Sequence, residues 1–143
     1  MTIEQQIDIL NQCICKETEL YGVWAKRHGM SYNTMMVLYA LDKGGNDTQK
    51  QIVKEWMIPK QTVNTVIKEL ERKGYVMFLE SGRKNRKMKL TQEGKKYTRE
   101  ILEDLYRIEY ESMEKMENSL RNAFIEGTIA HVKTFEEGVK NGA

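Results

Sequence analysis

The fold is decided by the stretch IPKQTVNTVIKELERKGYV, which occupies residues 58–76. Its pattern predicts one helix with Pro59 at the first helical position, where the missing N–H of proline costs nothing. Gly74 is expected to end this helix in the left-handed conformation. The buried face is predicted from apolar residues at helical spacing, namely Val63, Val66, Ile67 and Leu70.

The opposite face of this helix combines short hydrogen-bonding groups with long cations. Gln61 and Thr65 lie at its centre together with Lys68 and Arg72, and Thr62 and Asn64 lie on its flanks. Base edges and phosphates of DNA require these two kinds of group. The pattern therefore predicts a DNA-reading helix.

The neighbouring segments complete a winged helix-turn-helix. Thr48 and Gln51 fit a capping box at the start of a short helix, so that the turn at Met57 joins two helices. Residues 75–80 and 87–90 predict two strands around a glycine-containing loop with three cations, which is a β-hairpin wing. Thr91 is expected to cap the helix that follows.

The order of these elements resembles the MarR family of bacterial winged helix-turn-helix transcription regulators. The motifs that carry the resemblance are Thr62-Val63, LERKGY at residues 70–75 and LTQEG at residues 90–94. It implies a mainly α chain with a small β-hairpin wing (α+β), in which residues 1–143 form a single domain. The DNA-binding lobe would cover residues 31–91, and dimerisation helices would cover residues 2–28 and 92–140.

The wing departs from the family pattern in one respect. Many members carry an aspartate near the wing tip that holds a neighbouring arginine, whereas residues 82–86 of this chain contain no acid. Which cation enters the minor groove therefore stays open among Arg83, Lys84 and Arg86.

Charge is unevenly distributed along the chain. Residues 48–99 hold 14 Lys or Arg against 5 Asp or Glu, whereas the remaining residues hold 9 against 16. Such a basic segment is typical of a module that binds a polyanion, and we expect double-stranded DNA. From helical geometry, Gln61, Asn64 and Thr65 are expected to read bases, and Thr48, Lys60, Thr62 and Lys68 to bind phosphates.

Long amphipathic segments at both ends predict a homodimer. One apolar stripe runs from Ile3 to Trp24, and another runs from Tyr97 through Leu120 to Phe135, with a kink or a break expected at Gly127. A chain of this size has no internal partner for both stripes, so they are expected to meet those of a second copy. In the resembled family these helices interlock, which implies a pseudo-palindromic operator.

The sequence says less about what such a regulator senses. The resemblance implies small aromatic compounds, metals or oxidants as effectors. Tyr21, Trp24 and Tyr39 are candidates for a cleft that binds a small aromatic effector, although such residues also serve simply as core. The two histidines, His28 and His131, belong to no ligand-spaced cluster, so neither a metal site nor a cofactor is expected.

A redox-sensing repressor is the alternative that the cysteines suggest. Cys13 lies on the first predicted helix, where a peroxide-sensing branch of the resembled family keeps its reactive cysteine. Cys13 and Cys15 point about 200° apart on a helix, and cannot bridge each other there. Because reactivity requires both access and a lowered pKa, we expect buried structural cysteines.

Other classes of function find less support. The chain contains neither a G-x-S-x-G nor an H-E-x-x-H motif, so an enzyme is not expected. It also has no apolar run near the roughly 20 residues of a membrane span and no leader, so a cytoplasmic location is expected. A winged-helix protein-interaction module without specific DNA binding stays open as an alternative, although such a module would more often expose apolar anchors.

Overall fold

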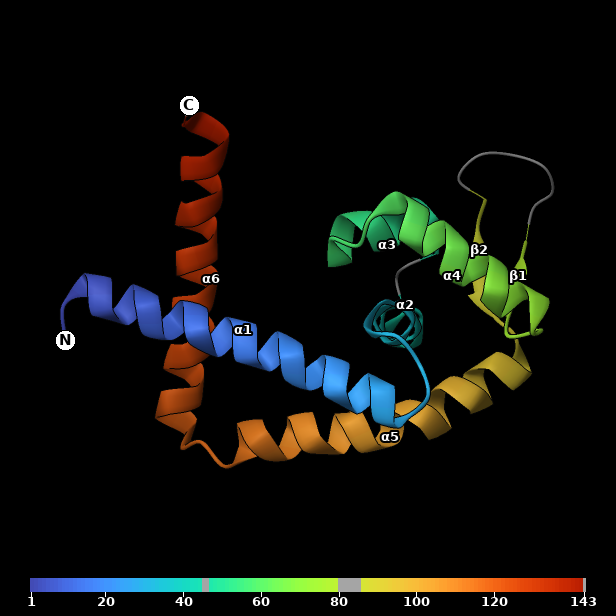
Figure 1. Cartoon of the computed structure of the whole chain (residues 1–143), viewed down its shortest axis with the longest axis horizontal. Helices are drawn as coiled ribbons and strands as arrows, with labels where there is room; N and C mark the ends of the chain where they lie inside the picture. Colours follow the sequence, from blue (N-terminus) through green and yellow to red (C-terminus); the bar gives the residue numbers. More distant parts are fainter. Residues whose placement is uncertain (45–46, 80–85, 143) are drawn as a thin grey trace. The chain divides into compact units, whose positions relative to one another are not determined.

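The computed structural model describes residues 1–44, 47–79 and 86–142 (Figure 1). These residues form six helices and one two-stranded sheet, which confirms the predicted class. In chain order the elements are α1 (Ile3–Arg27), α2 (Tyr32–Lys43), α3 (Gln49–Trp56), α4 (Lys60–Arg72), β1 (Val76–Phe78), β2 (Met88–Leu90), α5 (Gln92–Glu114) and α6 (Asn118–Asn141). The chain divides into two compact units, Met1–Glu103 and Asp104–Ala143, and the boundary falls inside α5.

Helix α2 forms the centre of the first unit and lies between α1 and the α3–α4 pair (Figure 1). Its residues Met35, Val37, Leu38 and Ala40 are fully buried. Ile52 of α3 packs into the same core, as do the four residues predicted for the buried face of α4, namely Val63, Val66, Ile67 and Leu70. The core thus holds the outer face of α4 toward solvent.

Both ends of α4 follow from local sequence. The helix begins one residue later than predicted, because Pro59 is extended and serves as the N-cap, with its carbonyl accepting the Val63 N–H (3.0 Å). At the other end Gly74 has φ of +82°. The Tyr75 N–H donates to the Leu70 carbonyl (2.9 Å) and the Gly74 N–H to the Glu71 carbonyl (3.0 Å). These two bonds form a Schellman motif, which confirms the predicted cap.

The capping box of α3 is also present. The Gln51 N–H donates to the Thr48 hydroxyl (3.2 Å), and the Gln51 side-chain oxygen accepts the Thr48 N–H (3.1 Å). Met57 then joins α3 to α4 in the left-handed conformation, with φ of +52°. This conformation is unusual for a residue with a side chain, and it makes the turn of the helix-turn-helix tight.

The end of α4, the wing and the start of α5 meet at Thr91. Its hydroxyl donates to the Gly74 carbonyl (2.6 Å) and accepts the Gly94 N–H (3.0 Å). Its own N–H donates to the Tyr75 carbonyl (3.0 Å). The Tyr75 and Tyr97 rings stack beside this junction, with centroids 4.2 Å apart. We call these four contacts the Thr91 junction.

Gly94 permits the close approach at this junction. A Cβ atom added to Gly94 would lie 2.0 Å from the Tyr75 carbonyl oxygen and 2.8 Å from its carbonyl carbon. No side chain fits there without moving the backbone. The LTQEG motif at residues 90–94 is thus explained by a cap and a backbone contact.

The second unit corrects the predicted break in the C-terminal segment. Gly127 lies inside α6, and α5 and α6 are instead separated at residues 115–117. The Arg121 guanidinium donates to the carbonyls of Met113 (3.2 Å) and Met116 (3.0 Å), which satisfies groups that the end of α5 leaves open. A single glycine costs a helix only about 1 kcal/mol, so α6 continues through Gly127.

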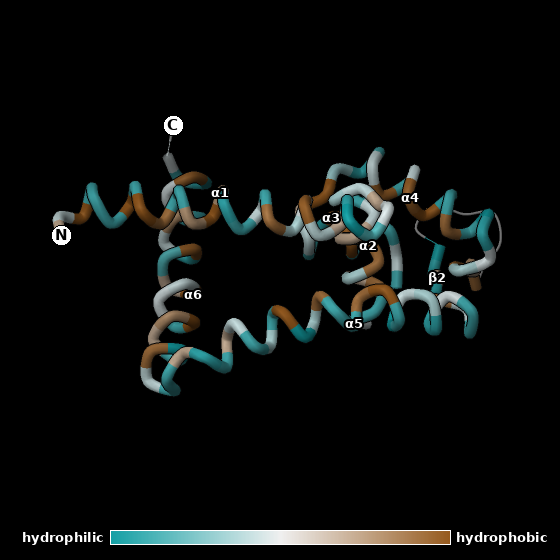
Figure 2. The backbone as a smooth tube through the Cα atoms, turned by 60° about the horizontal axis from the view of Figure 1, so that its bottom comes forward, coloured by the Kyte–Doolittle hydropathy of each residue, from teal (hydrophilic) through white to brown (hydrophobic). Residues whose placement is uncertain are grey.

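Helices α1 and α6 keep apolar residues exposed. No described residue of α6 is buried, although the helix has 24 residues. Residues 1–20 are exposed throughout, and Trp24 and Ala25 are the residues that α1 buries. Figure 2 shows hydrophobic residues recurring along both helices. None of the described helices combines the length and the apolar character that a membrane crossing requires.

Candidate nucleic-acid interface

The outer face of α4 presents most of the side chains predicted to contact DNA. Lys60, Gln61, Thr65 and Lys68 are exposed, and Thr62 and Asn64 are half-buried on the flanks. The Thr65 hydroxyl donates to the Gln61 carbonyl (2.9 Å), so its oxygen remains available as an acceptor. The face therefore combines amide, hydroxyl and ammonium groups along one side of a single helix.

The cations of α4 differ in how they are paired. Arg72 donates from Nε to the Glu69 carboxylate (3.1 Å), and hydrogen bonds from Arg72 lower the pKa of Glu69. Lys60 and Lys68 form no ion pair with any residue that the structure describes. These two ammonium groups are accordingly free for phosphates, whereas Arg72 already has a carboxylate partner.

Thr48 lies in a less open position than the other predicted contacts. The residue is 8% exposed, and its hydroxyl oxygen accepts the Gln51 N–H in the first turn of α3. A phosphate would reach Thr48 at the N-terminal end of α3, where backbone N–H groups also point outward. Its main structural role is the cap.

The wing has one inward and one outward face. Val76 pairs with Leu90 and Phe78 with Met88, and Arg86 lies two residues further along the same inward face. Its guanidinium carbon is 3.9 Å from the centroid of the Phe78 ring, a cation–π contact. Arg83 and Lys84 lie outside the described residues, so Arg86 is the predicted wing cation that the structure places.

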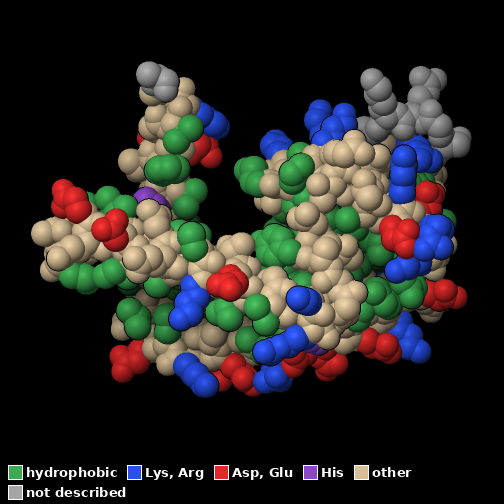
Figure 3. All heavy atoms as spheres, in the orientation of Figure 1, with side chains coloured by type: hydrophobic (Ala, Val, Ile, Leu, Met, Phe, Trp, Pro, Cys, Tyr) green, Lys and Arg blue, Asp and Glu red, His purple; other side chains and the backbone are tan. Residues whose placement is uncertain are grey.

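Sequence reasoning missed Phe78. The signal that could have found it is the strand register: with Phe78 opposite Met88, Arg86 is a diagonal neighbour on the same face. The outward face carries Met77, Leu79, Lys87 and Lys89, all exposed. Figure 3 shows Lys and Arg side chains gathered along the side of the lobe formed by α3, α4 and the wing.

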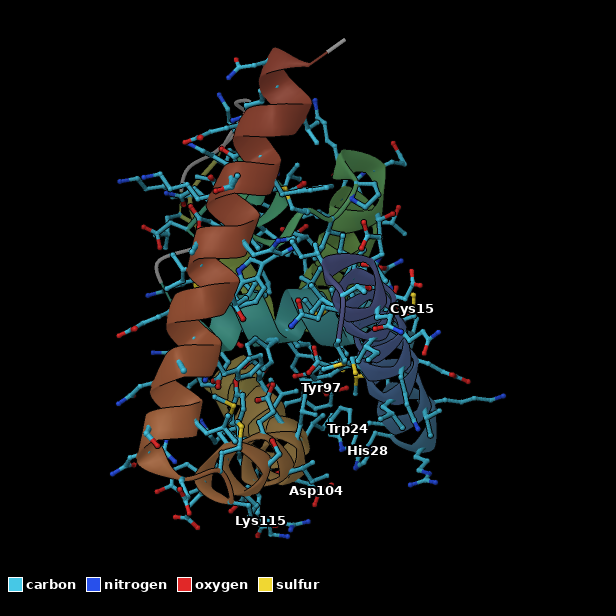
Figure 4. All side chains as sticks on the ribbon, turned by 90° about the vertical axis from the view of Figure 1, so that its left-hand side faces the viewer. Cys15, Trp24, His28, Tyr97, Asp104 and Lys115 are labelled. Carbon is cyan, nitrogen blue, oxygen red and sulfur yellow. The ribbon has the colours of Figure 1, made fainter. Side chains whose placement is uncertain are left out.

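Two of the three residues predicted for an effector cleft belong to separate aromatic pairs. Trp24 is buried and stacks on His28 with centroids 4.0 Å apart, at the C-terminal end of α1 (Figure 4). On α2, Tyr39 makes an edge contact with Trp56 of α3, with centroids 5.4 Å apart. Tyr21 is half-buried on α1.

The edge contact between Tyr39 and Trp56 has features that sequence reasoning missed. The ammonium of Lys43 lies 5.1 Å from the centroid of the Tyr39 ring. The indole nitrogen of Trp56 is buried and has no hydrogen-bond partner among the described residues. These contacts place a cation beside the aromatic pair.

The cysteines correct an expectation. Cys13 and Cys15 are free and exposed, whereas we expected them to be buried. The reason is that the first twenty residues, which include this part of α1, have no cover within the chain. Figure 4 labels Cys15 on α1. Among the described residues, His, Cys, Asp and Glu form no group of three or more that could hold a metal ion.

Comparison with known proteins agrees with this geometry. Residues 28–87, which cover α2, the helix-turn-helix and part of the wing, match the model of the MarR family. Over this segment the chain is similar to the MarR family. No curated protein matches its sequence.

Solved structures of MarR proteins share the fold along nearly the whole chain. A MarR family regulator from Neisseria meningitidis is similar with a TM-score of 0.81 and 26% identity, over 94% of this chain and 96% of that chain. Staphylococcus aureus MarR, solved with salicylate and kanamycin, has a TM-score of 0.68 and 16% identity, over 99% and 96%. Bordetella bronchiseptica BpsR, whose DNA binding is regulated by 6-hydroxynicotinic acid, has a TM-score of 0.69 and 18% identity, over 90% and 98%.

Proposed function

We propose that this MarR-like chain is a homodimeric, sequence-specific DNA-binding repressor that recognises a pseudo-palindromic operator and responds to a small aromatic effector. The observation that carries the proposal is the exposed polar and cationic face of α4, which stands beside a cation-bearing wing. A helix with this face can enter the major groove while the wing contacts the adjacent backbone.

The residue roles follow from position and pairing. Gln61, Asn64 and Thr65 read base edges, since amides and hydroxyls make directional contacts there. Phosphates are bound by Lys60, Thr62 and Lys68, and by Thr48 at the start of α3. Arg86, Arg83 and Lys84 supply the wing's contact with the minor groove or its backbone.

The exposed apolar residues of α1 and α6 support a second copy as the dimer partner. A 24-residue helix without a buried residue is marginal in water, because most helical stability comes from packing of an apolar face. The apolar residues that α6 leaves exposed are Leu120, Phe124, Ile125, Ile129, Val132, Phe135 and Val139. In the dimer, residues 2–28 and 92–140 pack against their copies and residues 31–91 form the DNA-binding lobe.

Tyr21, Trp24 and Tyr39 are proposed to line the effector site. The ammonium of Lys43 near the Tyr39 ring favours an acidic aromatic ring. The ligands of Staphylococcus aureus MarR and Bordetella bronchiseptica BpsR include such molecules, which supports the same class here.

The proposal is tested by gel-shift titration of the chain against the DNA upstream of its own gene. We expect saturable, salt-sensitive binding to one palindrome. Gln61→Ala should relax sequence preference, and Lys68→Ala should reduce the slope of log affinity against log salt by about one. Lys133→Ala on α6 is the control, since this exposed lysine is remote from α4 in sequence and has no ion pair among the described residues.

Two outcomes would contradict the proposal. Uniformly weak binding to every DNA would favour a winged-helix protein-interaction module, for which the exposed Met77 and Leu79 of the wing would be apolar anchors. Parental binding by both α4 variants at several salt concentrations would show that the assigned face does not contact DNA.

A redox-sensing repressor that uses Cys13 is a second candidate, favoured by the exposure of this thiol. Peroxide should then weaken operator binding by the parent and leave a Cys13→Ser variant unaffected. Operator binding that survives peroxide in the parent excludes this candidate.

A further inference from the structure

A second cationic surface lies away from the outer face of α4. A cleft of about 640 Å³ opens between the end of α2, strand β2 and the start of α5. Its lining residues are Leu41, Asp42, Gly44, Asp47, Met88, Lys89, Leu90, Lys95, Lys96 and Arg99. From the charge and shape of this cleft we propose that it binds a small phosphate-bearing dianion.

The cations of the cleft are largely unpaired. Lys89, Lys95 and Lys96 form no ion pair with any described residue. Arg99 contacts Asp42 at 3.5 Å between Nε and Oδ1, and its side chain remains 72% exposed. Most of the guanidinium donors are therefore available to a ligand.

The two acids of the cleft do not neutralise it. The Asp42 side chain is 9% exposed and faces Arg99, and Asp47 is exposed at the opposite wall. The Asp47 carbonyl accepts the Met88 N–H (2.7 Å), which holds this wall against β2. Four cations against two carboxylates leave the lining with a net charge of +2, which a dianion would match.

The arrangement is electrostatically unfavourable without a ligand. Lys95 and Arg99 stand four residues apart on one helix, a spacing at which like charges repel and destabilise the helix. Asp42 partly compensates Arg99 at 3.5 Å, whereas Lys95 has no carboxylate partner among the described residues. A bound dianion would offset the repulsion that the cleft otherwise retains.

The geometry favours phosphate over a monoanionic ligand. Lys89 belongs to β2, and the other three cationic lining residues belong to the first turns of α5, so the positive residues come from two elements of the fold. A phosphate group accepts hydrogen bonds on three oxygens and can be shared by several cations. Leu41, Met88 and Leu90 provide an apolar wall for the organic part of a phosphate ester.

The same chemistry could come from a phosphate of the DNA backbone, and the experiment separates the two sources. Inorganic phosphate is titrated into the full chain at constant ionic strength set with chloride, and amide resonances are followed by NMR. The parent should show saturable shifts at Lys89, Leu90 and Lys95. A Lys95→Gln/Lys96→Gln variant should bind at least about tenfold more weakly, and a Lys133→Gln control should match the parent.

Thermal unfolding gives an independent readout. Phosphate should raise the midpoint of the parent and of the control, but not that of the double variant. The proposal is overturned if phosphate causes no saturable resonance shifts in the parent, or if the double variant binds phosphate with the same affinity as the parent. It is also overturned if phosphate fails to bind while the double variant lowers the salt slope of operator binding, because the cleft cations would then contact DNA. Loss of operator binding through α4 variants leaves the cleft proposal untouched.

Discussion

Replacement of Gly94 by alanine should destabilise the chain strongly, although alanine is the better helix former. The added Cβ would lie 2.0 Å from the Tyr75 carbonyl oxygen, and the neighbouring atom is backbone, which cannot rotate away. Overpacking of this kind costs about 1–3 kcal/mol. Displacement of α5 would also weaken the two hydrogen bonds from Thr91 to Gly74 and Tyr75, each worth about 1 kcal/mol.

The higher helix propensity of alanine offsets about 1 kcal/mol of these losses. The net expectation is a loss of about 2–4 kcal/mol in the free energy of unfolding, measured by chemical denaturation followed by circular dichroism. Gly22→Ala is the matched control: it lies in α1, and its Cβ would meet no atom within 4 Å. That variant should be stabilised by up to about 1 kcal/mol. Equal stability of the Gly94 variant and the parent would refute the close approach.

Three further predictions concern the dimer, the alkaline range and the helix-turn-helix turn. Phe135 is 65% exposed and belongs to the apolar stripe that the proposed dimer buries. Phe135→Glu should therefore shift the dimer to monomer in analytical ultracentrifugation, because a charge would be buried at the interface. Thr134→Glu, at the neighbouring residue, should leave the dimer intact. Burial, with Tyr75 nearby, raises the pKa of Tyr97, so the unfolded chain ionises first and stability falls above about pH 10. Tyr97→Phe should lose less stability than the parent between about pH 9 and 11, and parallel pH profiles would contradict this. Met57 has φ of +52°, a left-handed conformation that strains a residue with a side chain. Met57→Gly should remove this strain and raise the free energy of unfolding by up to about 1 kcal/mol in the same denaturation assay. A lower free energy of unfolding would contradict the strain.

The helix boundaries that could be predicted from sequence are those with a local chemical signal. The capping box of Thr48 and Gln51 and the glycine cap at Gly74 act within a few residues, and both are present. The separation of α5 from α6 was not predictable in this way. It depends on Arg121 reaching back to carbonyls five and eight residues earlier, and no proline or glycine marks it.

Burial was harder to predict than periodicity. A repeating apolar pattern shows which face of a helix needs cover, but it does not show whether the cover comes from the same chain. Cys13 and Cys15 were expected inside because the sequence indicates neither access nor a lowered pKa for a thiol, yet both are exposed.

The candidate interface also contains some features that local sequence predicts and others that it does not. The outer face of α4 follows from helical spacing alone. The contact of Arg86 with Phe78 requires the register of two strands, and the cationic cleft requires α2, β2 and α5 to be placed together. Such features depend on tertiary placement, which a single sequence does not encode locally.

The Thr91 junction has a mechanical consequence for regulation. Thr91 forms hydrogen bonds to the carbonyls of Gly74 and Tyr75, and Gly94 packs directly against the Tyr75 backbone. These contacts hold the first turn of α5 against the end of α4. Helix α5 then continues without interruption across the boundary between the two units. Within the first unit, a reorientation of the first turn of α5 would therefore move the end of α4 and the base of the wing with it.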